Sequence, residues 1–394
     1  MAKRGNVDMT PAIAVGSGYT GLGTLRSLAE AGIPVYSACP SDDVSTKSRW
    51  FRPTPGPVRW NGSIGHEALR ILEDMPLAKA VLIPGADDAA LWVSQIPNSA
   101  LSERYKVSTS SHQTLQILQD KARFGDFLAQ TGIPHPRTFT ISSFDDIAAI
   151  PFAELDRVFI KPADSQSFRR VTGEKGVWAK DRSEFMEVWH QLDEKGFKLI
   201  AQEYVPGSGA DHYFIDGFRD RHGALPGLFA RRRERLYPPD FGNSTYSRSI
   251  PLSAVGSALE SLTMLLEKLQ YRGIFSAEFK RDARNGEFRL LEVNTRAWWY
   301  VEFATRCGVN VCRMAYEDAL DLPVTPASRN YPVGASCANL VSDIKSVLAQ
   351  DPAARSPLLT TLGQWTRCYY HVFRIDDPGP GLLASWRLLR RRFA

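Results

Sequence analysis

Two acidic residues and an asparagine lie on a hairpin predicted in the segment 273–296, GIFSAEFKRDARNGEFRLLEVNTR. Glu278 lies on the first strand, and Glu292 and Asn294 lie on the second, where residues two apart share a face. Carboxylate and amide oxygens suit Mg²⁺, a hard ion that usually also binds substrate phosphates, with Mn²⁺ as the alternative ion. The competing interpretation is a polar strand facing solvent, which the apolar neighbours in FRLLEVN disfavour.

The length of the hairpin turn decides whether the two acids face each other. A two-residue turn leaves them on opposite faces of the hairpin. A three-residue loop, with Gly286 in the left-handed conformation, pairs Ala283 with Glu287 and sets Glu278 opposite Glu292. We predict this second arrangement, in which two carboxylates with Cβ atoms about 5 Å apart repel each other unless a cation lies between them.

A glycine-rich turn near the start of the chain suggests a different chemistry. The stretch AVGSGYTGLG, residues 14–23, lies between an apolar strand and a predicted helix, where a backbone can approach a phosphate. A dinucleotide site also needs an acid about 20 residues further on, at the end of the second strand. That strand, 33–38, ends before Pro40, and the nearest acids, Asp42 and Asp43, lie beyond the proline. An NAD(P)-dependent oxidoreductase is therefore the less favoured alternative.

The spacing of apolar residues predicts the elements that position these groups. Up to about residue 107, short apolar strands alternate with helical patterns, which indicates a parallel sheet. From about residue 139, strands follow one another with fewer helices, which indicates a separate α+β region. A core helix is expected between 253 and 271, closed by Gly273. We expect strands at 12–15, 33–38, 79–83, 157–161, 176–179, 198–204, 212–216 and 224–232, and one helical segment from 111 to 130.

The composition limits the class of protein. A chain of 394 residues with 43% hydrophobic and 23% charged residues is typical of a globular protein with two or three domains. It contains no apolar run long enough to span a bilayer and no apolar signal-peptide core at its start, so we expect a cytoplasmic location. Five scattered cysteines argue against a disulfide framework and a zinc site. No RNA-binding signature accompanies the arginine clusters at 231–235 and 387–392, so we expect no nucleic-acid partner.

The end of the chain offers no chemistry. Its last predicted helix places Leu382, Trp386, Leu389 and Phe393 along one stripe, with arginines beside them. Such a helix either docks on the core or makes weak contact with an anionic membrane surface. Docking on the core is the favoured interpretation. The sequence does not indicate whether the protein is a monomer or an oligomer.

The motifs, taken in order, resemble the ATP-grasp superfamily. Its members end a strand in an acid, one residue and an asparagine, and a second metal-binding acid lies on the neighbouring strand. Glu292-Val293-Asn294 and Glu278 match this pattern, with Thr295 where close relatives usually have proline. Together with the opening glycine stretch and RRRERLYPPDFGNST, the pattern is similar to the carboxylate-amine ligases that include D-aspartate ligases. The resemblance covers most of residues 11–320.

The resemblance implies an α/β and α+β protein with the ATP-grasp fold. An N-terminal, Rossmann-like pre-ATP-grasp domain with a parallel sheet is expected at 1–110, followed by a helical linker and the small ATP-grasp subdomain at 111–205. The large subdomain with the metal site is expected at 206–322, and a C-terminal extension at 323–394. ATP is expected between the small and the large subdomain.

The same resemblance assigns a nucleotide site. Lys121 in QDKARF and Lys161 in VFIKPAD are similar to the two lysines that hold the phosphates. Two lysines and metal ions suit a triphosphate, whose negative charges need compensation. The stretch 165–177, which contains Gly173, resembles the loop that closes over the phosphates. The residues expected around the base and ribose are Gln202, Glu203, Tyr204, Val205 and Asp211.

The implied reaction is the ATP-dependent formation of an amide bond. ATP phosphorylates a carboxylate, expected to be that of an amino acid, and an amine then attacks the acyl phosphate to give the amide, ADP and phosphate. The alternative is a nucleotide-binding regulator without catalytic activity. Arg296 is expected to steady the acyl phosphate, and a guanidinium pairs well with a carboxylate. The expected catalytic residues are Arg296, Lys161 and Arg231, and the expected substrate contacts are Gly18, Tyr19, Thr20 and Arg232.

Overall fold

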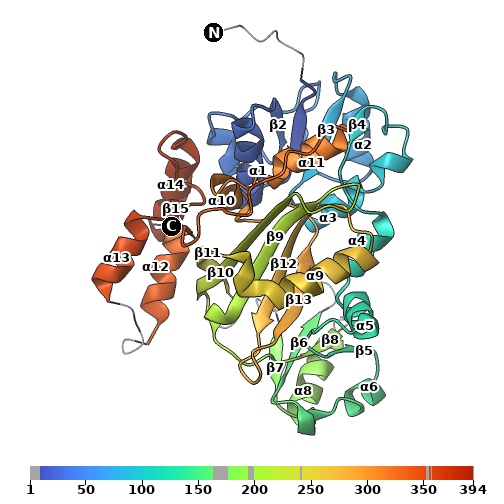
Figure 1. Ribbon diagram of the computed structural model, residues 1–394, viewed down its shortest axis with the longest axis vertical. Helices are drawn as coiled ribbons and strands as arrows, with labels where there is room; N and C mark the ends of the chain where they lie inside the picture. The colour runs from blue at the N-terminus through green and yellow to red at the C-terminus, as the bar shows by residue number, and fades with distance from the viewer. Residues whose placement is uncertain are drawn as a thin grey trace.

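The computed structural model describes residues 9–162, 176–193, 199–239, 242–351, 355 and 357–393. Its strands form three sheets, which lie along the long axis of the molecule (Figure 1). The N-terminal sheet lies at one end, the large sheet in the middle and the small sheet at the other end, with the C-terminal helices beside the large sheet. In this described part, no helix is both long enough and apolar enough to cross a membrane.

The N-terminal sheet is parallel, with the strand order β2-β1-β3-β4. The strands expected near its start are confirmed to within two residues. A glycine is needed at Gly21, because a Cβ atom there would lie 2.6 Å from the carbonyl oxygen of Gly16. The elements are β1 (Ala12–Val15), α1 (Gly18–Glu30), β2 (Val35–Ala38), α2 (His66–Asp74), β3 (Ala80–Pro84), α3 (Asp87–Val93) and β4 (Tyr105–Lys106).

Two helices, instead of the single predicted one, lead to the small sheet. The helical segment is interrupted at Asp120. Its carboxylate accepts hydrogen bonds from the N–H groups of Ala122 and Arg123 and so caps the second helix. The small sheet is antiparallel, with the order β5-β8-β6-β7. The elements are α4 (His112–Gln119), α5 (Lys121–Thr131), β5 (Thr138–Ile141), α6 (Phe144–Ala148), β6 (Val158–Pro162), β7 (Val177–Ala179), α8 (Arg182–Asp193) and β8 (Leu199–Glu203).

The large sheet has the order β13-β12-β9-β10-β11-β14-β15 and is antiparallel except between β14 and β15. Leucines of α9 pack on its buried face together with Ile215 and Phe275. The expected helix end at Gly273 is wrong, since α9 stops at Lys268 and Gly273 begins the next strand with a φ of 119°. The elements are β9 (His212–Arg219), β10 (Gly227–Tyr237), β11 (Asn243–Ile250), α9 (Gly256–Lys268), β12 (Gly273–Arg281) and β13 (Phe288–Asn294).

The hairpin between β12 and β13 differs from the predicted three-residue loop. The N–H of Asp282, not of Ala283, donates to the carbonyl oxygen of Glu287, so four residues form the turn. Without any further irregularity, this register would pair Glu278 with Leu291 and place Glu292 on the opposite face. A bulge at Leu291 adds one residue to β13 and returns Glu278 to a position opposite Glu292. The facing acids are therefore as predicted, although the turn that was expected to produce them is not.

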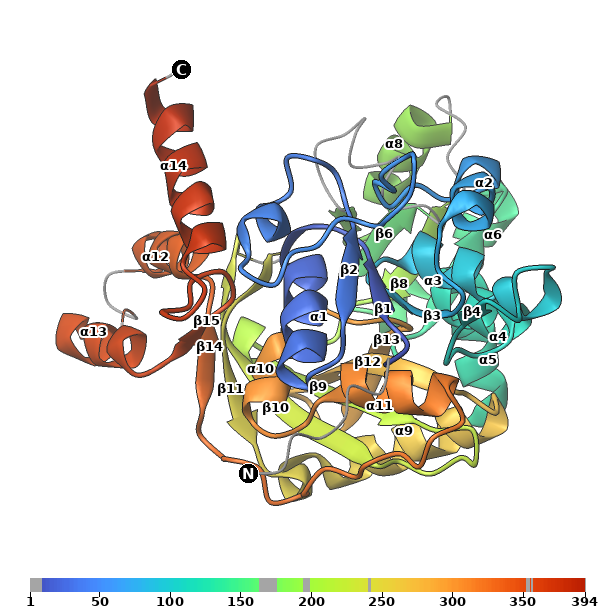
Figure 2. The same cartoon turned by 90° about the horizontal axis from the view of Figure 1, so that it is seen from above.

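The rest of the chain returns to the N-terminal sheet and then forms the C-terminal extension. Helices α10 and α11 pack with α1 in one hydrophobic core. In the view from above, α14 stands out from the body, and α12 and α13 lie on the same side (Figure 2). The elements are α10 (Val301–Arg306), α11 (Val311–Ala319), β14 (Ser336–Ala338), α12 (Leu340–Ala349), α13 (Leu358–Thr366), β15 (Tyr369–Tyr370) and α14 (Gly379–Phe393).

Candidate functional site

Two carboxylates face each other across β12 and β13, where Glu278 pairs with Glu292. Oε1 of Glu278 lies 2.6 Å from Nδ1 of His212 and 3.0 Å from Nη2 of Arg233. Burial by itself raises the pKa of Glu278, but the nearby charge of Arg233 and the hydrogen bond with His212 outweigh it and lower this pKa to about 2. Glu278 is therefore ionised at neutral pH.

The pKa of Glu292, the acid that faces Glu278, is shifted upwards. Desolvation by the surrounding protein raises the pKa of Glu292, and the charge of Glu278 raises it further; Lys161 and Lys121 act in the opposite direction, and solvent still reaches the side chain. Asn294 lies two residues along the same strand, and its Nδ2 is 3.3 Å from Oε1 of Glu292. A second negative charge is thus disfavoured at this point unless positive charge is added.

These oxygens suit a divalent cation. In the described residues, no group of three or more histidine, cysteine, aspartate or glutamate side chains is placed to hold a metal ion. The candidate set instead combines two facing carboxylates with the amide oxygen of Asn294. All-oxygen sets of this kind fit Mg²⁺, which keeps several waters or phosphate oxygens as its other ligands.

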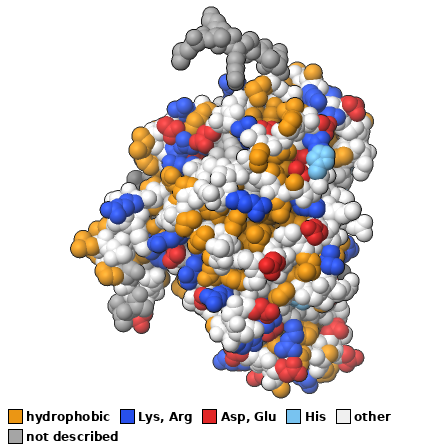
Figure 3. All heavy atoms as spheres, viewed as in Figure 1, with side chains coloured by type: hydrophobic (Ala, Val, Ile, Leu, Met, Phe, Trp, Pro, Cys, Tyr) orange, Lys and Arg blue, Asp and Glu red, His pale blue; other side chains and the backbone are white. Residues whose placement is uncertain are grey.

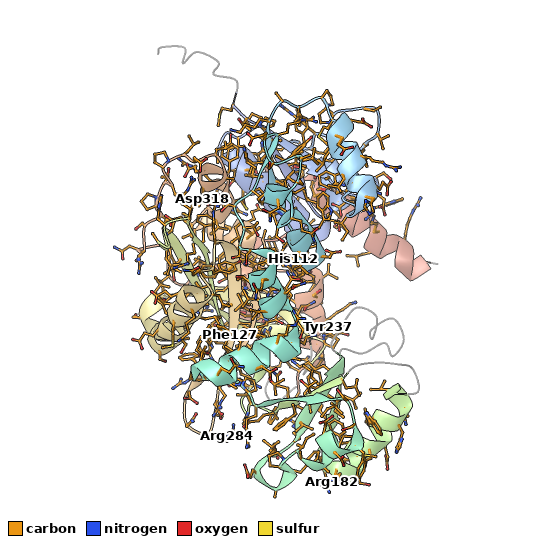
Figure 4. The ribbon with its side chains drawn as sticks, turned by 90° about the vertical axis from the view of Figure 1, so that its right-hand side faces the viewer. His112, Phe127, Arg182, Tyr237, Arg284 and Asp318 are labelled. Atoms are coloured by element: carbon orange, nitrogen blue, oxygen red, sulfur yellow. The ribbon has the colours of Figure 1, made fainter. Side chains whose placement is uncertain are left out.

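Two lysines face the acids from the small sheet and the linker. Lys161, on β6, and Lys121, at the start of α5, line one hollow of about 550 Å³ together with Gln202, Glu292 and Asn294. Burial lowers the pKa of Lys161 to about 8, and the charge of Lys121 acts in the same direction. This hollow therefore combines the positive charge of the two lysines with Glu292 and Asn294 of β13, and Glu278 lies behind Glu292 on the neighbouring strand. Figure 4 shows the side of the molecule on which His112 marks α4 and Phe127 marks α5.

A second hollow, of about 420 Å³, adjoins the first through Lys161 and Gln202. Aromatic and apolar side chains form much of its wall. The guanidinium of Arg157 lies 4.0 Å from the ring centre of Tyr204, and the ring of Trp178 meets Tyr204 edge to face. The hollow could therefore accept a flat, apolar group next to the lysines. Its lining includes Lys161, Gln202, Glu203, Tyr204, Val205, His212 and Lys280.

Not every residue expected near the base and ribose points into this hollow. The buried carboxylate of Glu203 pairs with Arg284 at 2.9 Å and with Arg137 at 3.6 Å. Oδ2 of Asp211 accepts from the N–H of Ser208 at 2.7 Å and lies 2.8 Å from its hydroxyl oxygen. Both carboxylates thus hold local structure. Gly173 lies outside the described residues.

The two arginines expected at the substrate, Arg231 and Arg232, lie on opposite faces of the large sheet. Arg231 and Arg232 are successive residues of β10, so their side chains point to opposite faces of the sheet. Arg232 donates to the carbonyl oxygen of Ala210. Arg231 is buried and pairs with Asp216 at 2.7 Å. It lies on the face of the acids, because Phe214 is paired with Arg231 on one side and with Glu278 on the other.

Arg296 connects the acids to the N-terminal sheet. Its guanidinium forms two hydrogen bonds of 2.9 Å with the carboxylate of Asp87, at the start of α3. It also donates to Oδ1 of Asn294 at 3.2 Å. Arg296 is therefore held beside the candidate metal ligands, as expected, by an aspartate that the sequence argument had not singled out.

The glycine turn carries a carboxylate of its own. The N–H of Gly18 donates to Oδ2 of Asp43 at 2.6 Å, so an acid occupies the place where a dinucleotide would need its phosphate. Tyr19 stacks on His371 at 5.7 Å and lines a hollow beside the C-terminal extension, separate from the one that contains Lys161. Thr20 is buried. The structure therefore does not join Gly18, Tyr19 and Thr20 to the lysines and acids.

Four further residues at the site were not predicted: His212, Arg233, Lys280 and Asp87. Two of them had a usable signal, because Lys280 is two residues from Glu278 and Arg233 is two residues from Arg231 on strands. His212 had none. It approaches Glu278 through the register that pairs it with Lys280 on the neighbouring strand.

Comparison with known proteins finds two curated relatives, one named as a ligase and one as a synthase. No family model matches the chain. The chain is 26% identical over 255 residues to a D-aspartate ligase of Enterococcus faecium, covering 61% of this chain and 58% of the relative. It is 22% identical over 331 residues to the carbamoyl phosphate synthase large chain of Thermoanaerobacter pseudethanolicus, covering 79% and 29%. The chain thus spans about a third to three-fifths of these curated relatives.

Solved structures share the fold over most of the chain. The N5-carboxyaminoimidazole synthetase of Staphylococcus aureus, complexed with ADP, has a TM-score of 0.62 and 14% identity, covering 84% of this chain and 81% of that one. The biotin carboxylase domain of the Hydrogenobacter thermophilus 2-oxoglutarate carboxylase, complexed with MgADP, also has a TM-score of 0.62, with 12% identity, covering 83% and 73%. The chain has the ATP-grasp fold of these enzymes, preceded by a parallel N-terminal sheet, as the sequence resemblance predicted.

Proposed function

We propose that this chain with the ATP-grasp fold is an ADP-forming ligase that joins a carboxylate to an amine. In the proposed reaction, the carboxylate oxygen attacks the γ-phosphorus of ATP, and ADP leaves. The amine nitrogen then attacks the carbonyl carbon of the acyl phosphate. The bond to the phosphate oxygen breaks, the amine loses a proton, and the products are an amide and inorganic phosphate.

The observation that carries this proposal is the pairing of Glu278 and Glu292 opposite Lys121 and Lys161. One acid is held ionised and the other resists ionisation, so the pair is suited to an added cation. The lysines line the same hollow as Glu292, and the charges of both acids act on Lys161. This arrangement of charges matches the polyphosphate of a nucleotide bound with its metal ion, whose negative charges need compensation during phosphoryl transfer.

The proposed roles of the residues follow from their positions. Lys121 and Lys161 hold the phosphates, and the hollow beside Tyr204 and Val205 receives the base. Glu278, Glu292 and Asn294 would hold Mg²⁺, or Mn²⁺ in its place, which supplies positive charge for the transferring phosphoryl group. Arg296 is held beside these ligands by Asp87 and by the carbonyl oxygen of Ala297, where its one remaining N–H, on Nη1, can orient the acyl phosphate.

An amino acid is the proposed carboxylate substrate, because the Enterococcus relative is named a D-aspartate ligase. Arg231 is the proposed contact for its carboxylate, since it lies on the same face as Glu278, with only Phe214 of β9 between them. Asp216 already pairs with one edge of the Arg231 guanidinium, which fixes its direction. The partners in this proposal are small molecules without nucleic acid, and because ATP is supplied in the cytoplasm, we infer that the reaction takes place there.

Incubation with MgATP, hydroxylamine and a panel of D- and L-amino acids tests the proposal. Hydroxylamine traps acyl phosphates as hydroxamates, so we expect ADP and hydroxamate in equal amounts with one carboxylate. ADP without hydroxamate would point to a different acceptor. ATP binding without ADP for every carboxylate tested would indicate a non-catalytic nucleotide-binding protein, and a titratable NAD(P)H signal without an ATP effect would indicate the oxidoreductase.

A further inference from the structure

The last part of the C-terminal extension, residues 340–393, carries an unusual share of the apolar side chains that reach solvent. Twelve of the twenty large hydrophobic side chains exposed in the described residues belong to it, although it makes up about a seventh of the chain. Ile375 is 91% exposed, Leu359 83% and Leu358 69%. Apolar side chains are visible at the outer edge of this region, on the left of Figure 3. Apolar surface gathered in this way commonly marks a binding face.

Buried ion pairs attach the inner side of the extension to the body. Arg26 of α1 is fully buried and pairs with Asp377 at 2.9 Å and with Glu302 at 3.0 Å. Arg235 of β10 pairs with Asp343 of α12 through two hydrogen bonds of 2.6 and 2.9 Å. Because these contacts fix how the extension is seated, its outward apolar side chains are a built feature of the fold.

Helix α14 combines apolar side chains with positive charge. Leu382 and Trp386, one turn apart, are 64% and 54% exposed, so the described part of the stripe does not dock on the core as expected. The side chains of Leu389 and Phe393 lie outside the described residues. The sequence from 378 to 394 contains four arginines and no acid. An amphipathic helix with tryptophan and leucine beside arginines is typical of segments that lie on an anionic membrane surface.

The extension also forms a groove beside this helix. A hollow of about 640 Å³ is lined on α12 and α14 by Leu340, Val341 and Leu388, and by Lys345 and Arg387. Arg387 also contacts the carbonyl oxygen and the exposed carboxylate of Asp42, which a lipid phosphate would have to replace or join. Apolar walls next to Lys345 and Arg387 suit an acyl chain with an anionic headgroup. A second copy of the chain suits the surface less, because a symmetric contact would bring the same positive charges together.

We propose that the C-terminal extension docks the protein on membranes that contain anionic lipid, as a peripheral contact through α14 and the groove. Exposed apolar side chains enter the headgroup boundary, and the arginines pair with lipid phosphates. This inference does not depend on the proposed reaction, because no residue of the lysine and acid hollows takes part in it.

Sedimentation of the full chain with vesicles tests the inference. We expect binding to phosphatidylcholine vesicles with about one-third phosphatidylglycerol, little binding to pure phosphatidylcholine, and partial release in about 1 M salt. The double variant Leu382→Ser/Trp386→Ser should bind at least about tenfold less, since it loses two large apolar groups. Met264→Ser is the matched control, because Met264 is 45% exposed on α9, and it should bind like the wild type.

Two results would overturn the inference. One is failure of the wild type to bind the anionic vesicles, or equal binding by the double variant. The other is a dimer in sedimentation velocity that is lost in the double variant without any vesicle binding, which would make a second copy the occupant. A cooperative thermal melt without ligands confirms that each variant is folded, and ADP release is measured separately, so a failure of the proposed reaction leaves the vesicle result intact.

Discussion

Replacing Glu292 with glutamine is expected to stabilise the protein while abolishing its reaction. Burial and the charge of Glu278 raise the pKa of Glu292 in the folded state. Ionisation of an acid with a raised folded pKa costs folding free energy. This cost is absent below its unfolded pKa of about 4.3, where the group is protonated in both states, and it is complete above the folded pKa. Glutamine keeps the shape of the side chain and removes this cost at neutral pH.

The size of the gain follows from the register. Like charges directly opposite each other on paired strands cost about 0.2–1 kcal/mol, and the nearby charges of Lys161 and Lys121, together with the solvent that reaches Glu292, reduce this cost. About 1 kcal/mol shifts the melting temperature of a domain of 150–250 residues by about 2–4 °C. We therefore expect Glu292→Gln to melt about 1–3 °C higher at pH 7 without ligands, and no higher than the wild type near pH 4.

The assay is thermal melting at both pH values, with and without MgATP, beside a measurement of ADP release. MgATP should raise the melting temperature of the wild type more than that of Glu292→Gln, because a ligand stabilises the state that binds it. ADP release should fall by about a hundredfold or more. Glu287→Gln is the matched control, since Glu287 lies on the same hairpin beside Arg289 and away from Glu278.

The reasoning is refuted if Glu292→Gln melts below the wild type at pH 7 without ligands. That result would mean that Glu292 makes a favourable contact in the folded state, not a strained one. Retention of full ADP release by the variant would equally remove the acid pair from the reaction.

Three further predictions rest on single residues. The affinity for ATP should fall as the pH rises through about 8, where Lys161 loses its charge, and Lys161→Arg should remove this dependence in a binding titration; an unchanged slope would contradict it. Gly18→Ala should cost about 1 kcal/mol in a urea melt, because Gly18 has a φ of 65°, and Gly32→Ala, with a φ of 74°, should share this cost; since Gly18 lies outside the hollow that contains Lys161, the ATP affinity of both variants should stay unchanged, and a weaker affinity of Gly18→Ala would contradict this separation. Arg26→Met should lose about 3 kcal/mol in the same melt because it leaves the buried Asp377 without its only ion-pair partner among the described residues, while Glu302 keeps Arg374 at 3.0 Å, and wild-type stability would show that the extension is held elsewhere.

The sequence predicted the parts of the site that depend on neighbours along one strand. Glu292 and Asn294 share a face because they are two residues apart, and Lys161 lies at the end of an apolar strand as expected. The fold class was also accessible, since alternating strands and helices indicate a parallel sheet at the start of the chain. These inferences use local periodicity, which tertiary contacts rarely change.

The parts that were missed depend on register and on distant contacts. The turn has one residue more than predicted, and the bulge at Leu291 adds one unpredicted residue to β13. The two differences cancel, so Glu278 still faces Glu292. A bulge depends on packing against neighbouring elements, which strand periodicity does not encode. His212 and Asp87 reach the site from other elements, 66 residues from Glu278 and 209 residues from Arg296 in the chain. No local pattern marks such partners.

The same limit applies to the C-terminal helix. Its apolar stripe is visible in the sequence, but a stripe looks the same whether it packs on the body or faces solvent. The buried ion pairs of Arg26 with Asp377 and of Arg235 with Asp343 attach the extension to the body. The side chains of Leu382 and Trp386, which follow these contacts in the chain, remain exposed to solvent.

The central claim, that ATP activates a carboxylate as an acyl phosphate, is tested most directly by labelling that carboxylate with heavy oxygen. The amino acid that supports ADP release is supplied with labelled carboxylate oxygens, and the inorganic phosphate is analysed by mass spectrometry. We predict that each phosphate formed by the wild type contains one labelled oxygen. The variant Glu292→Gln should form no labelled phosphate. Phosphate without label, formed together with the amide, would contradict this claim.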